Sequence, residues 1–207
     1  MLDTKERILM TALRLFAEGG FEAVSVSDIS GALGITKGAL YKHYRNKREI
    51  FARIVERMEQ RDAGLAAAHS LPVRPPEDAA DAYRVAAIDG MVDFAKAMFR
   101  YWTQDEFAAQ FRRMLTLEQF RSPEMASLYQ QYLAAGPMQY MADLFAAANI
   151  PQAQAEAVRF YAPMFLLYSV YDAAEDKTAA ISLAEAMLES AREHLRRSAA
   201  ENRNHNS

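Results

Sequence analysis

Residues 25–51, SVSDISGALGITKGALYKHYRNKREIF, constrain the fold of this chain more than any other segment. Ser25 and Asp28 have the spacing of a capping box, which opens a short helix, and Gly34 permits a tight turn after it. Thr36 can cap a second helix, expected to run to about Tyr44. Two short helices around a glycine turn predict a helix-turn-helix, a motif that places its second helix in the major groove of DNA.

The rest of the chain also has helical periodicity, and strand-like alternation bounded by turns is nearly missing. Residues 71–77, LPVRPPE, form a proline-rich break after a long helix. A second break or kink is expected at Gly136-Pro137. Beyond 28–33 and 36–44, seven further helices are predicted. They run from Thr4, as cap, to Gly19-Gly20, over 47–69 with Asn46 as cap, 79–102, 103–121 with Thr103 as cap, 122–149 with Ser122 as cap and Pro123 in the first position, 151–174 and 178–197.

Composition excludes several classes of protein. The chain has no cysteine, so it has neither disulfides nor thiolate chemistry. No apolar run reaches the roughly 18 residues that a membrane span needs, and the first ten residues lack the apolar core of a signal peptide. We therefore expect a cytoplasmic protein that does not enter a membrane.

Charge is unevenly distributed along the chain. Residues 1–61 hold 11 Lys and Arg against 8 Asp and Glu, whereas residues 62–207 hold 13 against 19. Neutralisation of phosphates supplies most of the non-specific affinity of proteins for DNA. The basic excess at the amino end favours a polyanionic partner there, although an excess of three charges is modest.

The second helix of the motif carries the side chains expected to read DNA. Lys37 and Lys42 can donate to guanine, and Gly38 lacks a Cβ, so the backbone can approach a base edge. Tyr41 can reach a phosphate, and His43 a base or a phosphate. The alternative is a solvated charged face with a poorly placed helical glycine. Leu40 and Tyr44 are expected to pack in the core.

Phosphate contacts are expected at the helix termini around this element. Lys47 lies in the first turn of the following helix, where the ammonium and the positive helix end together favour an anion. Arg45 and Arg48 are auxiliary candidates. Hydroxyls and amides near the caps can add contacts without giving up their capping role, at Ser25, Ser27 and Thr36.

The segment Thr4–Phe51 resembles the DNA-binding domain of the TetR family of bacterial transcriptional regulators. The resemblance is carried by ERILMTALRLFAEGGFEAVSVSDISGALGITKGALYKHYRNKREIF, which includes the Gly-Phe turn and the L-Y-x-H-[FY]-x-x-K signature. Tyr44 stands where the family usually has Phe, and Ser27 where a charged residue is common. The resemblance implies that Lys47 holds the DNA backbone.

The resemblance also implies that the remaining helices bind a small-molecule effector. Methionine and aromatic residues are frequent in this region; they can form ordinary core or a soft, adaptable cavity lining. The candidate ligand contacts are Met91, Phe94, Met98, Trp102, Phe111, Met114, Tyr129 and Tyr132.

Apolar stripes on the last two predicted helices favour a homodimer. A helix pair from each subunit can form a four-helix interface, and a two-fold dimer implies a palindromic operator. The alternative is that both stripes face the chain's own core. The candidate interface residues are Val158, Tyr161, Phe165, Tyr168, Ile181, Leu188 and Leu195.

These features predict an all-α protein of about nine helices. Residues 1–51 are assigned to the helix-turn-helix domain, 52–197 to a ligand-binding and dimerisation domain that begins with the long helix, and 198–207 to a disordered tail. We expect a repressor that a small apolar or amphipathic effector releases from double-stranded operator DNA. An activator or a ligand-independent regulator of the same fold remains an alternative.

An enzyme is disfavoured by the absence of recognisable catalytic spacings. The four histidines are scattered, and no His–Glu metal motif, Ser-His-Asp set or glycine-rich phosphate loop stands out. We therefore assign no catalytic residue, no metal site and no cofactor.

Overall fold

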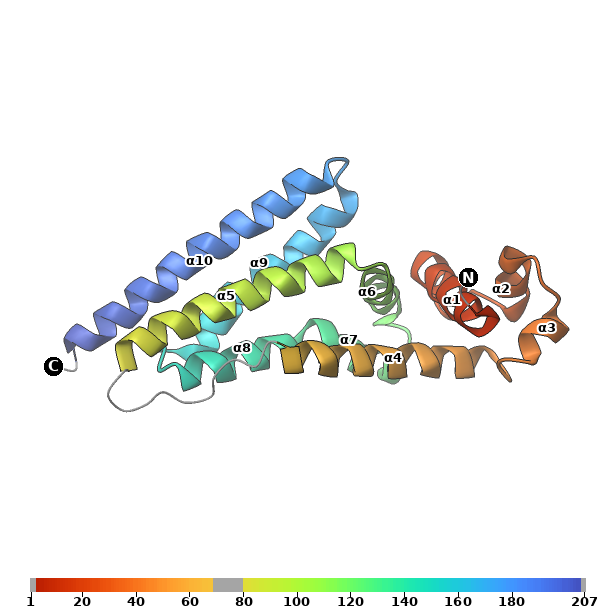
Figure 1. Ribbon diagram of the computed structural model, residues 1–207, viewed down its shortest axis with the longest axis horizontal. Coiled ribbons are helices and arrows are strands. Elements are labelled where there is room, and N and C mark those ends of the chain that lie inside the picture. The colour runs from red at the N-terminus through yellow and green to blue at the C-terminus, as the bar shows by residue number, and fades with distance from the viewer. Residues whose placement is uncertain (1–2, 69–79, 206–207) are drawn as a thin grey trace. The chain divides into compact units, whose positions relative to one another are not determined.

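The computed structural model describes the backbone of residues 3–68 and 80–205 and the side chains of residues 3–62, 64 and 87–201. Over these residues the chain forms helices and no strands (Figure 1), which confirms the all-α class. The helices are α1 Thr4–Gly19, α2 Val26–Leu33, α3 Lys37–Tyr41, α4 Lys47–Ala68, α5 Ala80–Gln104, α6 Glu106–Glu118, α7 Pro123–Leu133, α8 Ala135–Ala147, α9 Ala153–Ala173 and α10 Lys177–His205.

The described residues separate into two compact units that are not contiguous in sequence. The first unit contains residues 3–68 and 105–129, and the second contains residues 80–104 and 130–205. This division differs from the expected boundary at residue 51. The long helix α4, all of α6 and most of α7 belong with the helix-turn-helix.

The core of the first unit forms around one face of α1. Ile8, Ala12, Leu13 and Phe16 on this face have no exposed surface, and α2, α4 and α6 all pack against α1. The other helices contribute apolar residues at three- and four-residue spacing, as amphipathic helices do, including Ile50, Phe51, Ile54 and Met58 of α4 and Phe107, Phe111, Met114 and Leu115 of α6.

The helix ends around α2 and α3 follow the sequence signals. The Ser25 side chain accepts from the Asp28 N–H, and the Asp28 carboxylate accepts from the Ser25 N–H at 2.8 Å, so the capping box is confirmed. Gly34 has φ +67°, the left-handed conformation that glycine adopts without strain. The Thr36 hydroxyl accepts from the Ala39 N–H at 3.1 Å.

Several predicted helix boundaries were wrong. α3 ends at Tyr41, not at Tyr44, because the N–H groups of His43 and Tyr44 both return to the Leu40 carbonyl and the chain turns there. Thr103 lies inside α5, where its hydroxyl donates to the Phe99 carbonyl at 2.6 Å. The cap of α6 is instead Asp105, whose carboxylate accepts from the Ala108 N–H.

At the amino end, α1 begins at Thr4, and its N-cap is Asp3, which makes no side-chain capping bond. The expected capping role of Thr4 is therefore wrong.

The predicted helix 122–149 is two helices. Ser122 caps α7 and Pro123 occupies its first position, as expected. The break lies at Ala134, whose φ of −128° and ψ of −96° are not helical, and α8 begins at Ala135. A Cβ on Gly136 would lie 2.1 Å from the Gln131 carbonyl oxygen, so only glycine fits this close approach.

The carboxyl end is more ordered than expected. α10 continues to His205, through most of the segment predicted to be disordered. The segment lacks glycine and proline and includes Ala199, Ala200 and Glu201, which are strong helix formers, so propagation of an existing helix costs little. Residues 206–207 and the proline-rich break at 71–77 lie outside the described residues.

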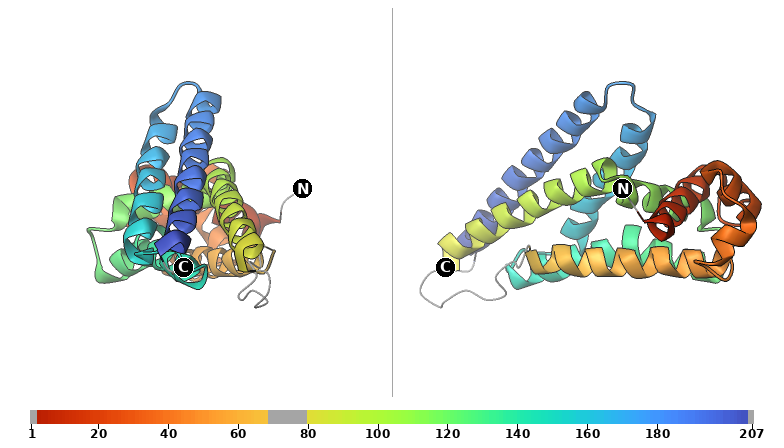
Figure 2. Two further views of the ribbon diagram at one scale, coloured as in Figure 1. Left: turned by 90° about the vertical axis from the view of Figure 1, so that its left-hand side faces the viewer. Right: turned by 45° about the vertical axis from the view of Figure 1, so that its right-hand side comes forward.

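The second unit is built from α5, α8, α9 and α10. Its core includes stacked rings of Phe99 and Tyr168, with centroids 5.4 Å apart, and an edge-to-face pair of Phe145 and Phe160. α9 and α10 pack against each other as a helical hairpin, and the right-hand view of Figure 2 shows them diverging from the loop that connects them. The Lys177 ammonium in the first turn of α10 donates to carbonyls at the end of α9.

Ion pairs join α5 to α10 along their exposed edge. Asp89 and Asp93 of α5 pair with Arg196 and Arg192 of α10, and Lys96 pairs with Glu189. The two aspartates are therefore used in structural pairs. No helix of the described chain is both long and apolar enough to cross a membrane.

Candidate nucleic-acid interface

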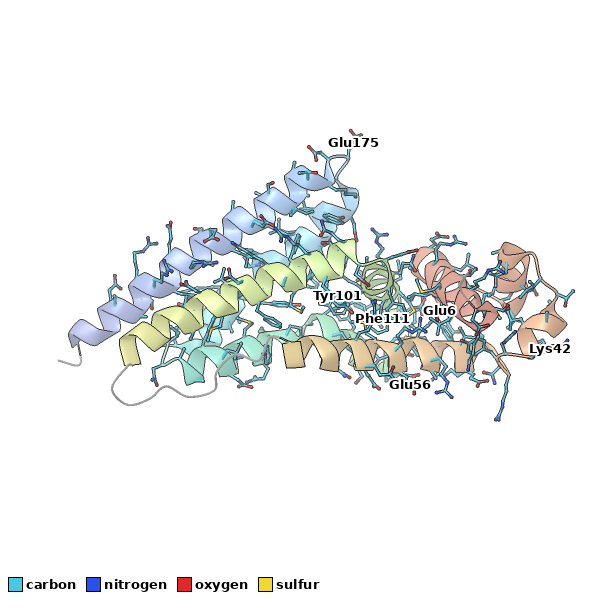
Figure 3. All side chains as sticks on the ribbon, in the orientation of Figure 1. Glu6, Lys42, Glu56, Tyr101, Phe111 and Glu175 are labelled. Atoms are coloured by element: carbon cyan, nitrogen blue, oxygen red, sulfur yellow. The ribbon has the colours of Figure 1, made fainter. Side chains whose placement is uncertain are left out.

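The short helix α3 has one buried face and one exposed face. Leu40 is fully buried and Tyr44, just after the helix, is 2% exposed; both were expected in the core. The Tyr44 hydroxyl donates to the Lys5 carbonyl of α1, which fixes the end of the turn. Lys37, Gly38, Tyr41 and Lys42 are exposed on the outer face, and Lys42 projects from the end of α3 in Figure 3.

His43 differs from these four residues because it is only partly exposed. Its N–H belongs to the turn that closes on Leu40. The ring therefore lies in the turn after α3, so any contact that His43 makes with DNA comes from the turn.

The fold does not require glycine at position 38. A Cβ placed there would meet only the Thr36 hydroxyl, at 3.8 Å, and the backbone does not have the positive φ that favours glycine. Glycine in a helix costs about 0.5–1 kcal/mol relative to alanine. If glycine is needed at position 38, the reason is a binding partner that approaches the exposed side of α3.

The hydroxyls near the caps are largely occupied. Ser25 Oγ donates to the Asp28 carboxylate at 2.7 Å, and these hydrogen bonds from Ser25 hold the pKa of Asp28 below its usual value. The Thr36 hydroxyl is engaged in capping α3. Ser27 is exposed, and its carbonyl accepts from the Ser30 hydroxyl.

Lys47 makes contacts that its sequence position did not reveal. Its ammonium donates to the Phe21 carbonyl at 2.6 Å and to the Glu22 carbonyl at 3.2 Å. It also lies 4.3 Å from the centroid of the Phe21 ring, within the range of a cation–π interaction. A lysine ammonium has three donors, so one remains for a phosphate.

The neighbouring arginines are held less firmly. Arg48 pairs with Glu124 at the start of α7, but both side chains are about half exposed, and such pairs contribute about 0–1 kcal/mol. Arg45 is exposed, and its main-chain N–H donates to the Glu49 carboxylate at 2.6 Å. Both guanidinium groups therefore stand at the surface beside the start of α4.

Glu118 was not singled out from the sequence, although it contacts this region. It is the last residue of α6 and is fully buried, and its carboxylate accepts from the Phe21 N–H at 2.9 Å. Gly20 allows this approach, since a Cβ there would lie 2.3 Å from Glu118 Oε1. The Gly-Phe turn was the only sequence signal, and the partner is 97 residues away.

The candidate effector contacts belong to both units. Met91, Trp102 and Tyr132 are buried, and Phe94 and Met98 half-buried, in the second unit. Phe111, Met114 and Tyr129 are buried in the first. Their assignment to a ligand stays a prediction.

The residues expected at the dimer interface fall into a buried group and an exposed group. Tyr161, Tyr168, Leu188 and Leu195 are at most 9% exposed and lie in the chain's own core, so these four are corrected from interface to core. The apolar stripes of α9 and α10 extend beyond the part of each helix that the rest of the chain leaves exposed. Ile181 is half-buried. The exposed stripe on α9 instead comprises Val158, Ala162, Phe165, Leu166 and Val170.

Known proteins resemble the chain in two ways. The family described as bacterial regulatory proteins, tetR family, matches residues 8–54. The regulator AcrR of Shigella flexneri is 40% identical over 57 residues, which are 28% of this chain and 26% of that protein. The negative regulator IcaR of the biofilm operon icaADBC, from Staphylococcus epidermidis, is 42% identical over 52 residues, 25% of this chain and 28% of that protein. The matched segment thus spans only about a quarter of these relatives.

A solved structure extends the resemblance in fold. A TetR/AcrR-family regulator from Thermobifida fusca has a TM-score of 0.57 and 18% identity, and the match covers 92% of this chain and 97% of that one. At this identity the likeness shows the fold alone. Residues 8–54 therefore resemble the tetR family of bacterial regulatory proteins in sequence, and most of the chain shares the fold of a TetR/AcrR-family regulator.

Proposed function

We propose that the chain is a dimeric, sequence-specific DNA-binding repressor that a small apolar or amphipathic effector releases from a palindromic operator. The observation that carries the proposal is the two-faced α3, which is anchored by Leu40 and Tyr44 and exposes two lysines and a tyrosine on its outer side. In a helix-turn-helix, that outer side is the one that enters the major groove. A DNA partner implies a cytoplasmic protein.

The exposed groups suit distinct parts of a DNA duplex. Lys37 and Lys42 can donate to guanine O6 and N7 in the groove. The Tyr41 hydroxyl and the remaining donor of Lys47 suit phosphates, which set register and supply affinity without reading sequence. The relatives with the matching segment are transcriptional regulators by name, and IcaR is a negative one.

The exposed stripe on α9 supports the dimer. Leu166 is 65% exposed and Phe165 41% exposed, on a helix of a protein whose other large apolar residues are mostly buried. A contiguous apolar stripe on a soluble helix is typical of an interface. Pairing this stripe with its copy across a two-fold axis would place two α3 helices on one operator.

The residue types of the candidate ligand contacts favour the second unit as the binding site of the effector. Its candidate residues Met91, Phe94, Met98, Trp102 and Tyr132 are methionine and aromatic, which suit an apolar ligand. The first unit contains an open pocket of about 510 Å³ lined mainly by α1 and α4 residues. That lining is charged, with Glu6 paired to Arg57 and Arg53 to Glu56, so it does not suit an apolar effector.

Substitutions around α3 are expected to separate phosphate contacts from base contacts. Tyr41→Phe and Lys47→Ala should weaken binding to all duplexes alike, and Lys47→Ala should also reduce the salt slope by about one. Lys37→Ala should cost about 1–3 kcal/mol on the operator and relax the preference at one base pair. Gel-shift titrations at two salt concentrations measure these effects. Arg100→Ala in α5 is the charge-matched control, and unchanged affinity in all three variants would contradict the proposed interface.

A pair of glycine substitutions tests whether α3 approaches DNA closely. Gly38→Ala should stabilise the fold by about 0.5–1 kcal/mol and yet lower operator affinity, because the added methyl group faces the bases. Gly64→Ala in α4, where nothing lies within 4 Å of the new Cβ, should give a similar stabilisation with unchanged affinity. Thermal unfolding and gel shifts measure the two quantities. Equal affinity for both variants would argue against close approach at position 38.

A charge placed in the α9 stripe is expected to separate the subunits. Leu166→Arg should convert a dimer of twice the 23.3 kDa chain mass into a monomer, because an unpaired buried charge is costly. Light scattering after size exclusion measures the mass. Leu117→Arg in α6, which replaces an equally apolar residue that is 45% exposed, is the control and should remain dimeric. A dimeric Leu166→Arg protein would place the interface elsewhere.

An apolar effector should raise the melting temperature of the protein and reduce operator binding. A thermal-shift screen with alkyl carboxylates, alkyl ammonium compounds and neutral flat aromatics covers the three charge types of amphipathic ligand. A hit at 100 times its Kd should stabilise the protein by about 2.7 kcal/mol. Met98→Arg should abolish the shift. A ligand that binds tightly and leaves operator affinity unchanged would not be the proposed effector.

A further inference from the structure

A buried carboxylate holds the main chain just after α1. Glu118 Oε1 accepts from the Phe21 N–H at 2.9 Å, and Arg121 Nε lies 3.6 Å from the same oxygen. The other oxygen, Oε2, is buried and has no hydrogen-bond partner among the described residues. Burying a carboxylate with so few polar partners lowers the stability of the fold, and the hydrogen bond to the Phe21 N–H offsets part of that cost.

Lys47 contacts Phe21 from the side opposite Glu118. The Phe21 carbonyl accepts from the Lys47 ammonium at 2.6 Å, and the Phe21 ring lies beneath that ammonium. The ring also packs against Phe16 and Phe51, with centroids 5.2 and 5.0 Å away. Phe21 is thus fixed by its N–H, its carbonyl and its side chain.

We infer that Glu118 is a positioning residue for the DNA contact of Lys47 and acts through Phe21. This inference rests on the proposed function, because it assigns the ammonium of Lys47 to a phosphate of the operator. α6 thereby takes part in DNA binding without touching DNA.

The physical argument is one of linked hydrogen bonds. The Glu118 carboxylate at the N–H of Phe21 and the Lys47 ammonium at its carbonyl each align with the dipole of the peptide group that they contact, so together they fix both peptide groups that flank Phe21. A lysine side chain has high rotamer entropy, and fixing it before DNA arrives removes that cost from binding. Without the Glu118 acceptor, the buried Phe21 N–H is unsatisfied, and the turn that holds Lys47 loses its anchor.

The exposed pair between Arg48 and Glu124 provides a contrast. It also joins α4 to the segment after α6, but its side chains are 57% and 46% exposed. Solvent and salt screen such a pair, so it cannot position a neighbouring group as a buried bond does. The effect on DNA binding should therefore be specific to Glu118.

Two substitutions at residue 118 separate the hydrogen bond from the shape of the side chain. Glu118→Gln keeps an acceptor for Phe21, and operator affinity should remain within about threefold of that of the natural chain. Glu118→Met keeps the length without an acceptor, and affinity should fall about tenfold. Glu118→Met should also lose part of the salt slope, as Lys47→Met does, because the ammonium no longer meets its phosphate. Glu106→Gln, at an exposed carboxylate in the first turn of the same helix, is the matched control, with affinity unchanged.

A double-mutant cycle tests the path through Lys47. If Lys47→Met alone costs about tenfold, the double variant Glu118→Met/Lys47→Met should be no more than about twofold weaker than Lys47→Met. The same cycle with Lys37→Met on α3 should be additive, at about the product of the single effects. Circular dichroism and thermal unfolding verify that each variant is folded. If Glu118→Met does not fold, Glu118→Asp, which keeps the charge but is one methylene shorter, replaces it in the cycle with the same expectation.

The outcomes distinguish this inference from the proposed function. A natural chain that does not bind duplex DNA at low salt would refute the proposed function. If the natural chain binds and the Glu118–Lys47 cycle is additive, the positioning role is wrong while the DNA-binding function stands. A Glu118→Gln protein that binds as weakly as Glu118→Met would likewise overturn the role of the acceptor.

Discussion

The burial of one face of α1 is the interaction on which the DNA-reading element depends. α2 has eight residues and α3 has five, and helices this short are not stable alone in water. They persist because Ile29 and Leu40 are completely buried in the same core as Ile8, Ala12 and Phe16 of α1. The outer face of α3 can then consist of exposed polar groups and a glycine, since it contributes nothing to that core.

Specific polar contacts set the geometry that apolar packing leaves open. The Ser25–Asp28 capping box fixes the start of α2, and Thr36 fixes the start of α3. The turn after α1 is fixed by Glu118 from one side and Lys47 from the other. A hydrogen bond has a direction, whereas apolar burial does not, so these bonds determine how the exposed groups are aimed.

Elements with a local cause could be predicted well. The caps at Ser25, Thr36, Asn46 and Ser122, the left-handed glycine at Gly34 and the break near Gly136-Pro137 each depend on residues within a few positions of one another. The end of α3 could not be predicted in the same way, because it depends on Tyr44 reaching the Lys5 carbonyl, 39 residues away. The membership of α6 in the first unit likewise depends on packing against α1.

The sequence by itself determined the all-α class, the helix-turn-helix and the exposed lysines of α3, because periodicity and capping are short-range properties. Only the tertiary structure decided which apolar stripes are core. Tyr161, Tyr168, Leu188 and Leu195 are covered by the chain itself, whereas Leu166 is not. It also decided that Glu118 meets Phe21, since a contact between residues 97 apart exists only once α6 has packed on α1. Burial and long-range hydrogen bonding depend on which helices become neighbours, and a helix's own sequence does not contain that information.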